Sequence, residues 1–155
     1  MYQVTGFLDI ETQGPGLVEI GPRIETWIAR EGREATGLVT LLSQHTSASL
    51  TIQENADPDV RRDLVDAMAR LAPQGGAELY RHHAEGPDDM AAHVRTVLSG
   101  VHLAIPVERG RLMLGTWQGV YLWEHRDRPH RRRVALHYLT DGADMADARQ
   151  RPLQR

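Results

Sequence analysis

The stretch VHLAIPVERGRLMLGTWQGVYLWEHRDRPHRRRVALHYL, from Val101 to Leu139, decides the fold class of this chain. Its apolar residues gather in four short runs, which are 101–107, 111–116, 118–125 and 132–139. The turns between these runs suit hairpin connections, and short runs with such spacing favour antiparallel strands. The C-terminal half is therefore expected to form an antiparallel sheet.

The segments that precede this stretch add strands and one short helix. Three of them are strand candidates by alternation or apolar content, namely 2–12, 38–43 and 48–52. After the first of them, Ile24, Trp27 and Ile28 recur with helical spacing, and the helical pattern stops near Gly32. The N-terminal third is expected to hold strands with a helix between them.

Two more helices are expected in the middle of the chain. Asp57 followed by Pro58 is a strong helix start, because the carboxylate can cap the first turn and proline suits the first helical position. Up to Pro73, one face of this helix carries the apolar residues Val60, Leu64, Met68 and Leu71. A second helix is expected from Asp88 to Ser99, ending at Gly100. Its apolar stripe consists of Met90, Val94, Val97 and Leu98. We expect both stripes to pack against the sheet.

The order of these elements predicts an α+β fold with a mostly antiparallel sheet. No repeat or long linker divides the 155 residues, so one domain is expected over 1–140. Residues 141–155 are small and charged and are expected to form a flexible tail.

Composition excludes several classes of function. The chain has no cysteine, and all 18 basic residues are arginine, which removes thiol chemistry, Schiff-base chemistry and the P-loop lysine. A net charge of −3 gives little support for nucleic-acid binding. No apolar run reaches the ~20 residues of a membrane helix, and MYQVTGFLDIET does not resemble a secretory signal. A cytoplasmic protein without nucleic-acid or membrane partners is expected.

The first polar constellation is HTSASLTIQENADP, which begins at His45. His45, Glu54 and Asn55 can ligate a metal or transfer a proton, and the helix start that follows can hold an anion. The alternative is a polar strand end whose hydroxyl groups satisfy the backbone.

The second constellation is HHAEGPDDMAAH, from His82 to His93. Asp89 and His93 lie four residues apart on one face of the expected helix. An imidazole held by a carboxylate is a common arrangement at metal sites. The alternative is a half-buried histidine that only pairs with Asp89. The choice between His82 and His83 as a ligand stays open.

The third constellation is GRLMLGTWQGVYLWEH, from Gly110 to His125. In a strand, Gln118 and Glu124 share a face with apolar neighbours, so Glu124 needs a cation, a metal or a proton there. Trp117 is expected in the core. The arginine run over 126–133 is either a solvated turn or a phosphate clamp.

In this order, the three constellations resemble the YjbQ family, also called uncharacterised protein family 0047. The matching stretches are QHTSASLTIQENADPDVRRDL, YRHHAEGPDDMAAHV and IPVERGRLMLGTWQGVYLWEHRD. The resemblance covers about Tyr2 to Leu139 and implies a curved, half-barrel-like antiparallel sheet packed with two or three helices. It also implies a homotrimer with a site near the subunit interface.

The resemblance further implies a divalent metal ion (Zn, Mn, Ni or Mg) held by histidines. Carried over to this chain, the ligands are His45, His82 and His93. The catalytic or supporting residues are His45, Asn55, Asp89, Gln118 and Glu124. Some members of the family are described as secondary thiamine-phosphate synthases. The implied function is therefore a metal-dependent transferase that joins an aminopyrimidine diphosphate to a thiazole phosphate. The alternatives are a metal-dependent hydrolase and a non-catalytic module that binds a phosphorylated metabolite.

Overall fold

The computed structural model describes residues 1–31 and 35–140. Within them the chain forms eight strands and three helices. Among the described helices, none has the length and apolar content that crossing a bilayer requires. The expected helix end at Gly32 and the expected tail over 141–155 lie outside the described residues.

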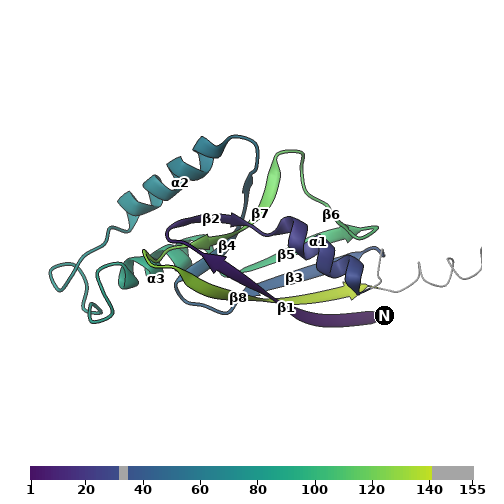
Figure 1. Ribbon diagram of the computed structural model, residues 1–155, viewed down its shortest axis with the longest axis horizontal. Coiled ribbons are helices and arrows are strands. Elements are labelled where there is room, and N and C mark those ends of the chain that lie inside the picture. The colour runs from purple at the N-terminus through teal and green to yellow at the C-terminus, as the bar shows by residue number, and fades with distance from the viewer. Residues whose placement is uncertain (32–34, 141–155) are drawn as a thin grey trace, which may run out of the picture.

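The larger sheet has five strands and curls around the core (Figure 1). Its order is β1 (Tyr2–Thr12), β8 (His130–Thr140), β3 (Gly37–Ser43), β5 (His102–Glu108) and β6 (Arg111–Leu112). All neighbouring strands run antiparallel. β1 and β8 pair over their full length, and each strand expected here from the sequence is present, although β6 is much shorter than the run at 111–116.

A second sheet of three strands packs on the first. It consists of β2 (Gly16–Glu19), β7 (Gln118–Glu124) and β4 (Ala48–Glu54), again antiparallel. β2 had no sequence signal of its own, because it is four residues long and follows a Gly/Pro turn. The expected α+β class with a curved antiparallel sheet is confirmed.

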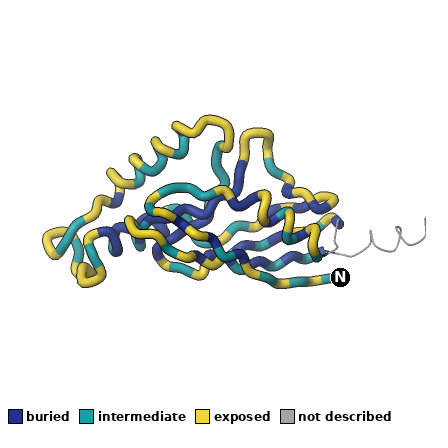
Figure 2. Tube along the Cα trace, viewed as in Figure 1, coloured by how far each residue is buried: buried dark blue, intermediate teal, exposed yellow. Residues whose placement is uncertain are grey.

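The core lies between the two sheets, where Figure 2 shows the buried residues. β7 contributes most, because Gly119–Glu124 are all buried although side chains alternate between its faces. The largest fully buried apolar side chains include Ile10, Leu41, Leu50, Ile105, Leu122 and Leu136, which come from both sheets. Burial of both faces of β7 explains its continuous apolar run.

A buried ion pair joins the two sheets at one end of this core. Glu124 on β7 has no exposed surface, and Arg132 on β8 is 4% exposed. Arg132 donates from Nε and Nη2 to the two carboxylate oxygens, at 2.7 and 2.6 Å. Thr12 Oγ1 on β1 donates to Glu124 Oε2 at 2.8 Å. Burial by itself raises the pKa of Glu124, but the hydrogen bonds outweigh it and hold the pKa below its ordinary value.

α1 (Gly21–Arg30) covers one end of the core through Ile24 and Ile28, which are fully buried. Trp27 of the same helix lies over Gly6 of β1. A Cβ atom at Gly6 would stand 2.5 Å from Trp27 Nε1, so only glycine allows this contact. The predicted helical spacing of these three apolar residues is confirmed.

α2 (Pro58–Leu71) begins as expected, because the Asp57 carboxylate accepts the N–H of Asp59 at 2.8 Å. The expected packing against a sheet is only partly borne out, because the helix contacts β2 and β4 and Val60, Leu64 and Met68 are only half-buried. The helix has no buried residue, Leu71 is 71% exposed, and Figure 1 shows the helix projecting from the body of the protein. Trp117, on the loop before β7, is also 65% exposed instead of lying in the core.

α3 (Asp89–Ser99) packs against β4 with a different face from the one expected. Its buried side chains are Ala91, Ala92, Arg95 and Thr96, together with Asp89 at its start. Val97 is 84% and Leu98 58% exposed, so the expected packing through Val97 is wrong. Small residues face the sheet because they let the helix approach closely, and this turns the two large apolar residues outward.

His125, which follows β7, is a buried titratable group in the same region. It is 1% exposed and its Nε2 lies 2.8 Å from Ser49 Oγ. Burial, together with the positive charge of Arg95, lowers its pKa from 6.5 to about 4. The ring is therefore neutral in the folded protein above that pH.

We expect Glu124→Gln to lower the free energy of unfolding by about 3–5 kcal/mol, because it leaves the buried Arg132 without a counter-charge. Urea unfolding at pH 7.5 measures the change. Arg62→Ala is the control, since the side chains of the Arg62–Asp59 pair are 74% and 68% exposed. Loss of this exposed pair should change the free energy of unfolding by about 1 kcal/mol or less. Equal effects of the two substitutions would contradict the role of the buried pair.

Stability should also fall as the pH decreases from 6.5 towards 4 because of His125. The unfolded chain protonates His125 near pH 6.5, whereas the folded protein protonates it only near pH 4. The contribution of the neutral ring to the free energy of unfolding is therefore complete above pH 6.5. It decreases as the pH falls, and about 3 kcal/mol is lost at pH 4. Unfolding free energies at several pH values should give a shallower slope for His125→Asn than for the wild type. Parallel slopes would show that His125 does not titrate this way.

Candidate functional site

Two histidines and one carboxylate converge at the start of α3. His82 lies in the loop between α2 and α3, and Asp89 and His93 stand one turn apart on α3. His82 Nε2 is 2.8 Å and His93 Nε2 is 3.3 Å from the same oxygen, Asp89 Oδ2. One ligand atom from each residue lies within 4.8 Å of the others. We call these three residues the histidine–aspartate cluster.

The tautomer of His93 is set by its second ring nitrogen. His93 Nδ1 lies 2.9 Å from the carbonyl oxygen of Thr46. Because a carbonyl only accepts, Nδ1 carries the proton and Nε2 of the neutral ring presents a lone pair towards Asp89. Two acceptors then face each other at 3.3 Å. Such an arrangement requires a proton or a cation between them.

Arg126 holds the carboxylates at the start of the helix. Its Nε donates to Asp88 Oδ2 at 2.8 Å, and its Nη1 donates to Asp89 Oδ1. Asp89 therefore keeps Oδ2 for the two histidines. Burial raises the pKa of Asp88, but the bonds from Arg126 and the N–H of Asp127 outweigh it and lower that pKa. Arg126 is positioned in turn by Glu124, whose Oε1 accepts the Arg126 backbone N–H at 2.9 Å.

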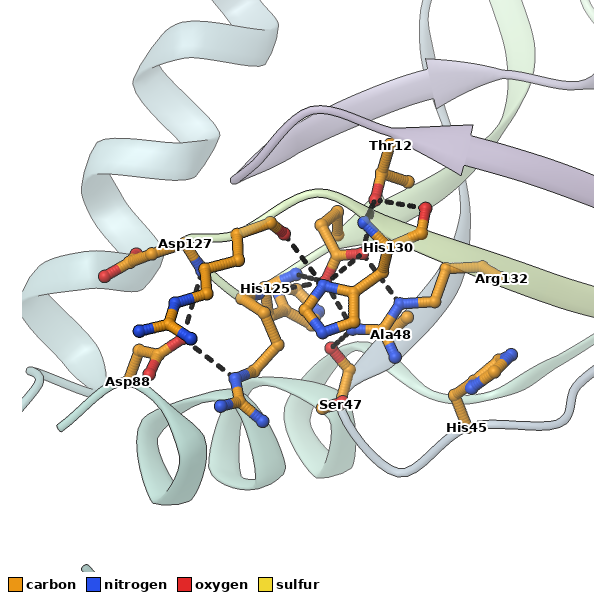
Figure 3. Close-up of polar contacts among 12 residues, drawn as sticks. Thr12, His45, Ser47, Ala48, Asp88, His125, Asp127, His130 and Arg132 are labelled. Carbon is orange, nitrogen blue, oxygen red and sulfur yellow. Dashed lines mark hydrogen bonds and ion pairs between the residues drawn. The ribbon is translucent and has the colours of Figure 1, made fainter. Parts of the chain in front are cut away.

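His45 lies on the loop between β3 and β4, outside the histidine–aspartate cluster. Figure 3 draws no hydrogen bond or ion pair between His45 and the polar network around His125 and His130. Its Nε2 accepts the backbone N–H of Arg133 at 2.7 Å, so the neutral ring carries its proton on Nδ1. Burial, with the nearby charge of Arg132, lowers the pKa of His45. In this structure His45 accepts a hydrogen bond at Nε2, and its Nδ1–H is the group available to donate.

His45 and His93 line one cavity of about 590 Å³. Its walls come from residues 43–46, from α3 between His93 and Gly100, and from Val101 and His102 at the start of β5. We call it the α3 cavity. His93 belongs both to this cavity and to the histidine–aspartate cluster, so a molecule in the cavity lies next to the cluster.

The other expected site residues lie elsewhere. Asn55 and Gln118 contact each other, with Asn55 Nδ2 donating to the Gln118 carbonyl at 3.3 Å. They stand at one end of the β4–β7 pair, whereas Glu124 stands at the other, opposite Ala48. Gln118 and Glu124 are six residue steps apart along β7, or about 20 Å. Within one chain, the structure does not bring Asn55 and Gln118 to the histidines.

The arginine run is largely occupied by pairing inside the chain. Arg126 pairs with Asp88 and Asp89, Arg132 with Glu124, and both Arg131 and Arg133 with Asp9. Those last two pairs lower the pKa of Asp9 to about 2 through hydrogen bonds from Arg133 and Arg131. Arg128 is exposed and forms no ion pair with any residue that the structure describes.

The structure also distinguishes the two neighbouring histidines and gives other residues supporting roles that the sequence did not indicate. His82 contacts Asp89, while His83 is exposed and lies outside the cluster. Asp88 and Arg126 support the cluster, and the Thr46 carbonyl orients His93. Asp88 stands beside Asp89 in the second constellation, so its position was visible. Arg126 was expected as a member of the arginine run, but its pairing with Asp88 and Asp89 had no local signal, because these partners lie 38 and 37 residues away.

The donor set of the cluster fits a divalent transition metal. Two imidazole nitrogens and one carboxylate oxygen form the set typical of open catalytic zinc sites and of non-haem iron sites. The hydrogen bonds of His93 to Thr46 and of Asp89 to Arg126 are the outer contacts that such ligands usually make. Chemically, the site can bind a cation and leave room on the cavity side for a small molecule.

Comparisons with known proteins agree with this fold. A family model described as UPF0047 protein YjbQ-like matches residues 7–141. The chain is 52% identical over 130 residues to the UPF0047 protein sll1880 of Synechocystis, covering 84% of this chain and 87% of that protein. It is 43% identical over 133 residues to the UPF0047 protein YjbQ of Escherichia coli O157:H7, covering 86% and 94%.

Solved structures show the same architecture. The conserved hypothetical protein TT1486 of Thermus thermophilus superposes with a TM-score of 0.77 at 40% identity, covering 86% of this chain and 99% of that one. The hypothetical protein APE1520 of Aeropyrum pernix gives 0.79 at 30% identity, covering 89% and 99%. On the family match and these identities, the chain belongs to the YjbQ-like UPF0047 family.

Proposed function

We propose that the chain is a metal-dependent enzyme that acts on a small phosphorylated molecule. One observation supports this above all others: the Nε2 atoms of His82 and His93 converge on a single oxygen of Asp89. Because His93 Nδ1 already donates to Thr46, a shared cation removes the clash of acceptors. In this proposal His82, Asp89 and His93 hold the ion.

A divalent ion bound there supplies positive charge to a phosphate or diphosphate group as negative charge develops on it. The chain's own residues do the positioning. Asp89 is held by Arg126, and Arg126 is held by the Glu124 carboxylate. Glu124 thus enters as a positioning residue and not as a proton carrier, since Arg132, Thr12 and two backbone N–H groups occupy its oxygens.

His45 supplies a neutral donor beside the cluster. Its Nε2 is engaged by Arg133, so Nδ1–H is the group it can offer to an oxygen of a ligand. Arg128, which has no ion pair among the described residues, is the member of the arginine run best placed to bind an anion from solution. In this proposal these two groups take the role of the phosphate clamp, which was one of the two alternatives for the arginine run.

The finer proposal is thiamine-phosphate synthesis from an aminopyrimidine diphosphate and a thiazole phosphate, with release of pyrophosphate. The family resemblance supports it, and a diphosphate leaving group matches a site that combines a cation with hydrogen-bond donors. A metal-dependent hydrolase is the second candidate, because two histidines and a carboxylate are also the ligand set of zinc hydrolases.

The proposal includes a homotrimer with the site near a subunit interface, which the family resemblance supports. Asn55 and Gln118 lie at the end of the β4–β7 pair that is about 20 Å from Glu124 in one chain, and a second copy could bring them to the cluster. The exposed Trp117 stands beside them, and α2 has no buried residue. Both features suit surfaces that another copy covers.

We expect His93→Ala to lose bound metal, because it removes one of three ligands. Elemental analysis of the purified protein should give about one divalent ion per wild-type chain, and Zn²⁺ affinity should fall about tenfold or more in the variant. His83→Ala is the matched control, since this neighbouring histidine is exposed and lies outside the cluster. Metal content that is unchanged in His93→Ala would remove His93 from the ligand set.

The activity test mixes purified protein, Mn²⁺ and the two thiamine precursors and follows thiamine phosphate and pyrophosphate. Synthesis should fall by about 10²-fold or more in His93→Ala, since the cation that stabilises developing charge is lost, and should persist in His83→Ala. Synthesis that survives in both His93→Ala and His45→Ala would place the activity elsewhere. Release of inorganic phosphate without thiamine phosphate would favour the hydrolase, and saturable binding without turnover would favour the binding module.

A further inference from the structure

We propose that the α3 cavity binds the flat, uncharged ring of a phosphorylated ligand, with the phosphate directed to the histidine–aspartate cluster. This inference rests on the proposed function and adds to it the pocket that would select an aromatic or heteroaromatic ring on the phosphorylated ligand. The ring would lie against Val97 and Val101, and Thr96 would donate or accept one hydrogen bond at the edge of the ring.

The position of the α3 cavity supports two-part recognition. His93 is shared, because its ring lines the cavity while its Nε2 faces Asp89 in the cluster. His45 lines the same cavity from the opposite element, the β3–β4 loop. A volume of about 590 Å³ is within the range of small-molecule sites, roughly 300–1,000 Å³. One ligand can therefore fill the cavity and reach the cluster.

The residues that line the α3 cavity suit the uncharged ring of the ligand and not its phosphate group. Within the described part of the chain, no Asp, Glu or Arg lines the α3 cavity, and His45 and His93 carry hydrogen bonds consistent with neutral rings. An anion placed there would lose its hydration without gaining a counter-charge, which is costly. A flat ring instead gains apolar contact and stacks against imidazole. The charged end of the ligand belongs at the cluster, outside the cavity.

Val97 provides the apolar surface for this ring. It is 84% exposed, although it stands on a helix whose opposite face is packed, and Val101 follows on the far side of Gly100. Gly100 has φ 90°, a left-handed conformation that turns the chain sharply from α3 into β5. Both valines line the cavity. Contact with a ring would remove this exposed apolar surface from water.

Thr96 supplies an unused polar group at the same place. It lines the cavity and is 4% exposed. Among the described residues, its Oγ1 is the one buried side-chain nitrogen or oxygen atom without a hydrogen-bond partner. In helices a threonine hydroxyl commonly bonds to the carbonyl four residues earlier, as Ser99 does here with Arg95. Thr96 does not. The proposed contact requires that rotation about the Cα–Cβ bond turn this buried hydroxyl towards the cavity.

The test measures binding of three probes to Zn²⁺-loaded protein by calorimetry: inorganic phosphate, phenyl phosphate and pyridin-3-yl phosphate. Phenyl phosphate should bind at least about tenfold more tightly than inorganic phosphate, from burial of the ring. Val97→Glu should abolish this preference and leave the affinity for inorganic phosphate unchanged. Leu98→Glu is the matched control, because Leu98 is the next residue on α3, is 58% exposed and does not line the cavity.

Thr96→Val tests the polar contact with a side chain of the same shape. Pyridin-3-yl phosphate should bind about three- to tenfold more tightly than phenyl phosphate to the wild type, because its ring nitrogen can accept from Thr96. This difference should disappear in Thr96→Val, while phenyl phosphate keeps its affinity. Saturation-transfer NMR on the ring protons gives a second readout of contact that does not depend on catalysis.

The outcomes separate this inference from the proposed function. Absence of Zn²⁺ binding overturns the proposed metal site itself. Binding of Zn²⁺ and inorganic phosphate with no gain from the ring overturns only the ring pocket. If Val97→Glu instead changes the mass of the assembly in light scattering and leaves the ring preference intact, the cavity is a contact between copies of the chain and the inference is overturned.

Discussion

The buried pair of Glu124 and Arg132 is the constraint on which the rest of the structure depends. Glu124 stands on β7 of the small sheet and Arg132 on β8 of the large sheet, so the pair ties the two layers together where the core ends. Both charges are removed from water, and each is stable there only because the other is present. Thr12 on β1 and two backbone N–H groups fill the remaining acceptor positions of the carboxylate.

The candidate site is built outward from this pair. Glu124 accepts the backbone N–H of Arg126, Arg126 binds the carboxylates of Asp88 and Asp89, and Asp89 faces the two histidines. This series of hydrogen bonds fixes the position of Asp89 relative to the end of β7. The bonds of Arg126 to Asp89 and of Thr46 to His93 are outer contacts of the kind that orient metal ligands.

Local patterns predicted the strands and the helix starts well, and the reasons are local. Alternation along β1, the cap formed by Asp57 and the glycine after α3 each act within a few residues. The burial of the helices was predicted poorly. Val97 and Leu71 belong to apolar stripes, yet both are exposed, because the face that a helix presents to a sheet depends on how close the backbones approach. In α3 the small side chains of Ala91 and Ala92 are buried and allow the helix to lie close to β4.

The sequence by itself determined the fold class, the order of the elements and the set of polar residues available for chemistry, since these follow from spacing and residue type. It also placed Asp89 and His93 on one helix face. Only the tertiary structure decided which of these groups meet. It brought His82 to Asp89, engaged Glu124 with Arg132, and set Gln118 at the opposite end of β7. The physical reason is that contacts between residues distant in sequence depend on how the sheets stack, and no local pattern contains that information.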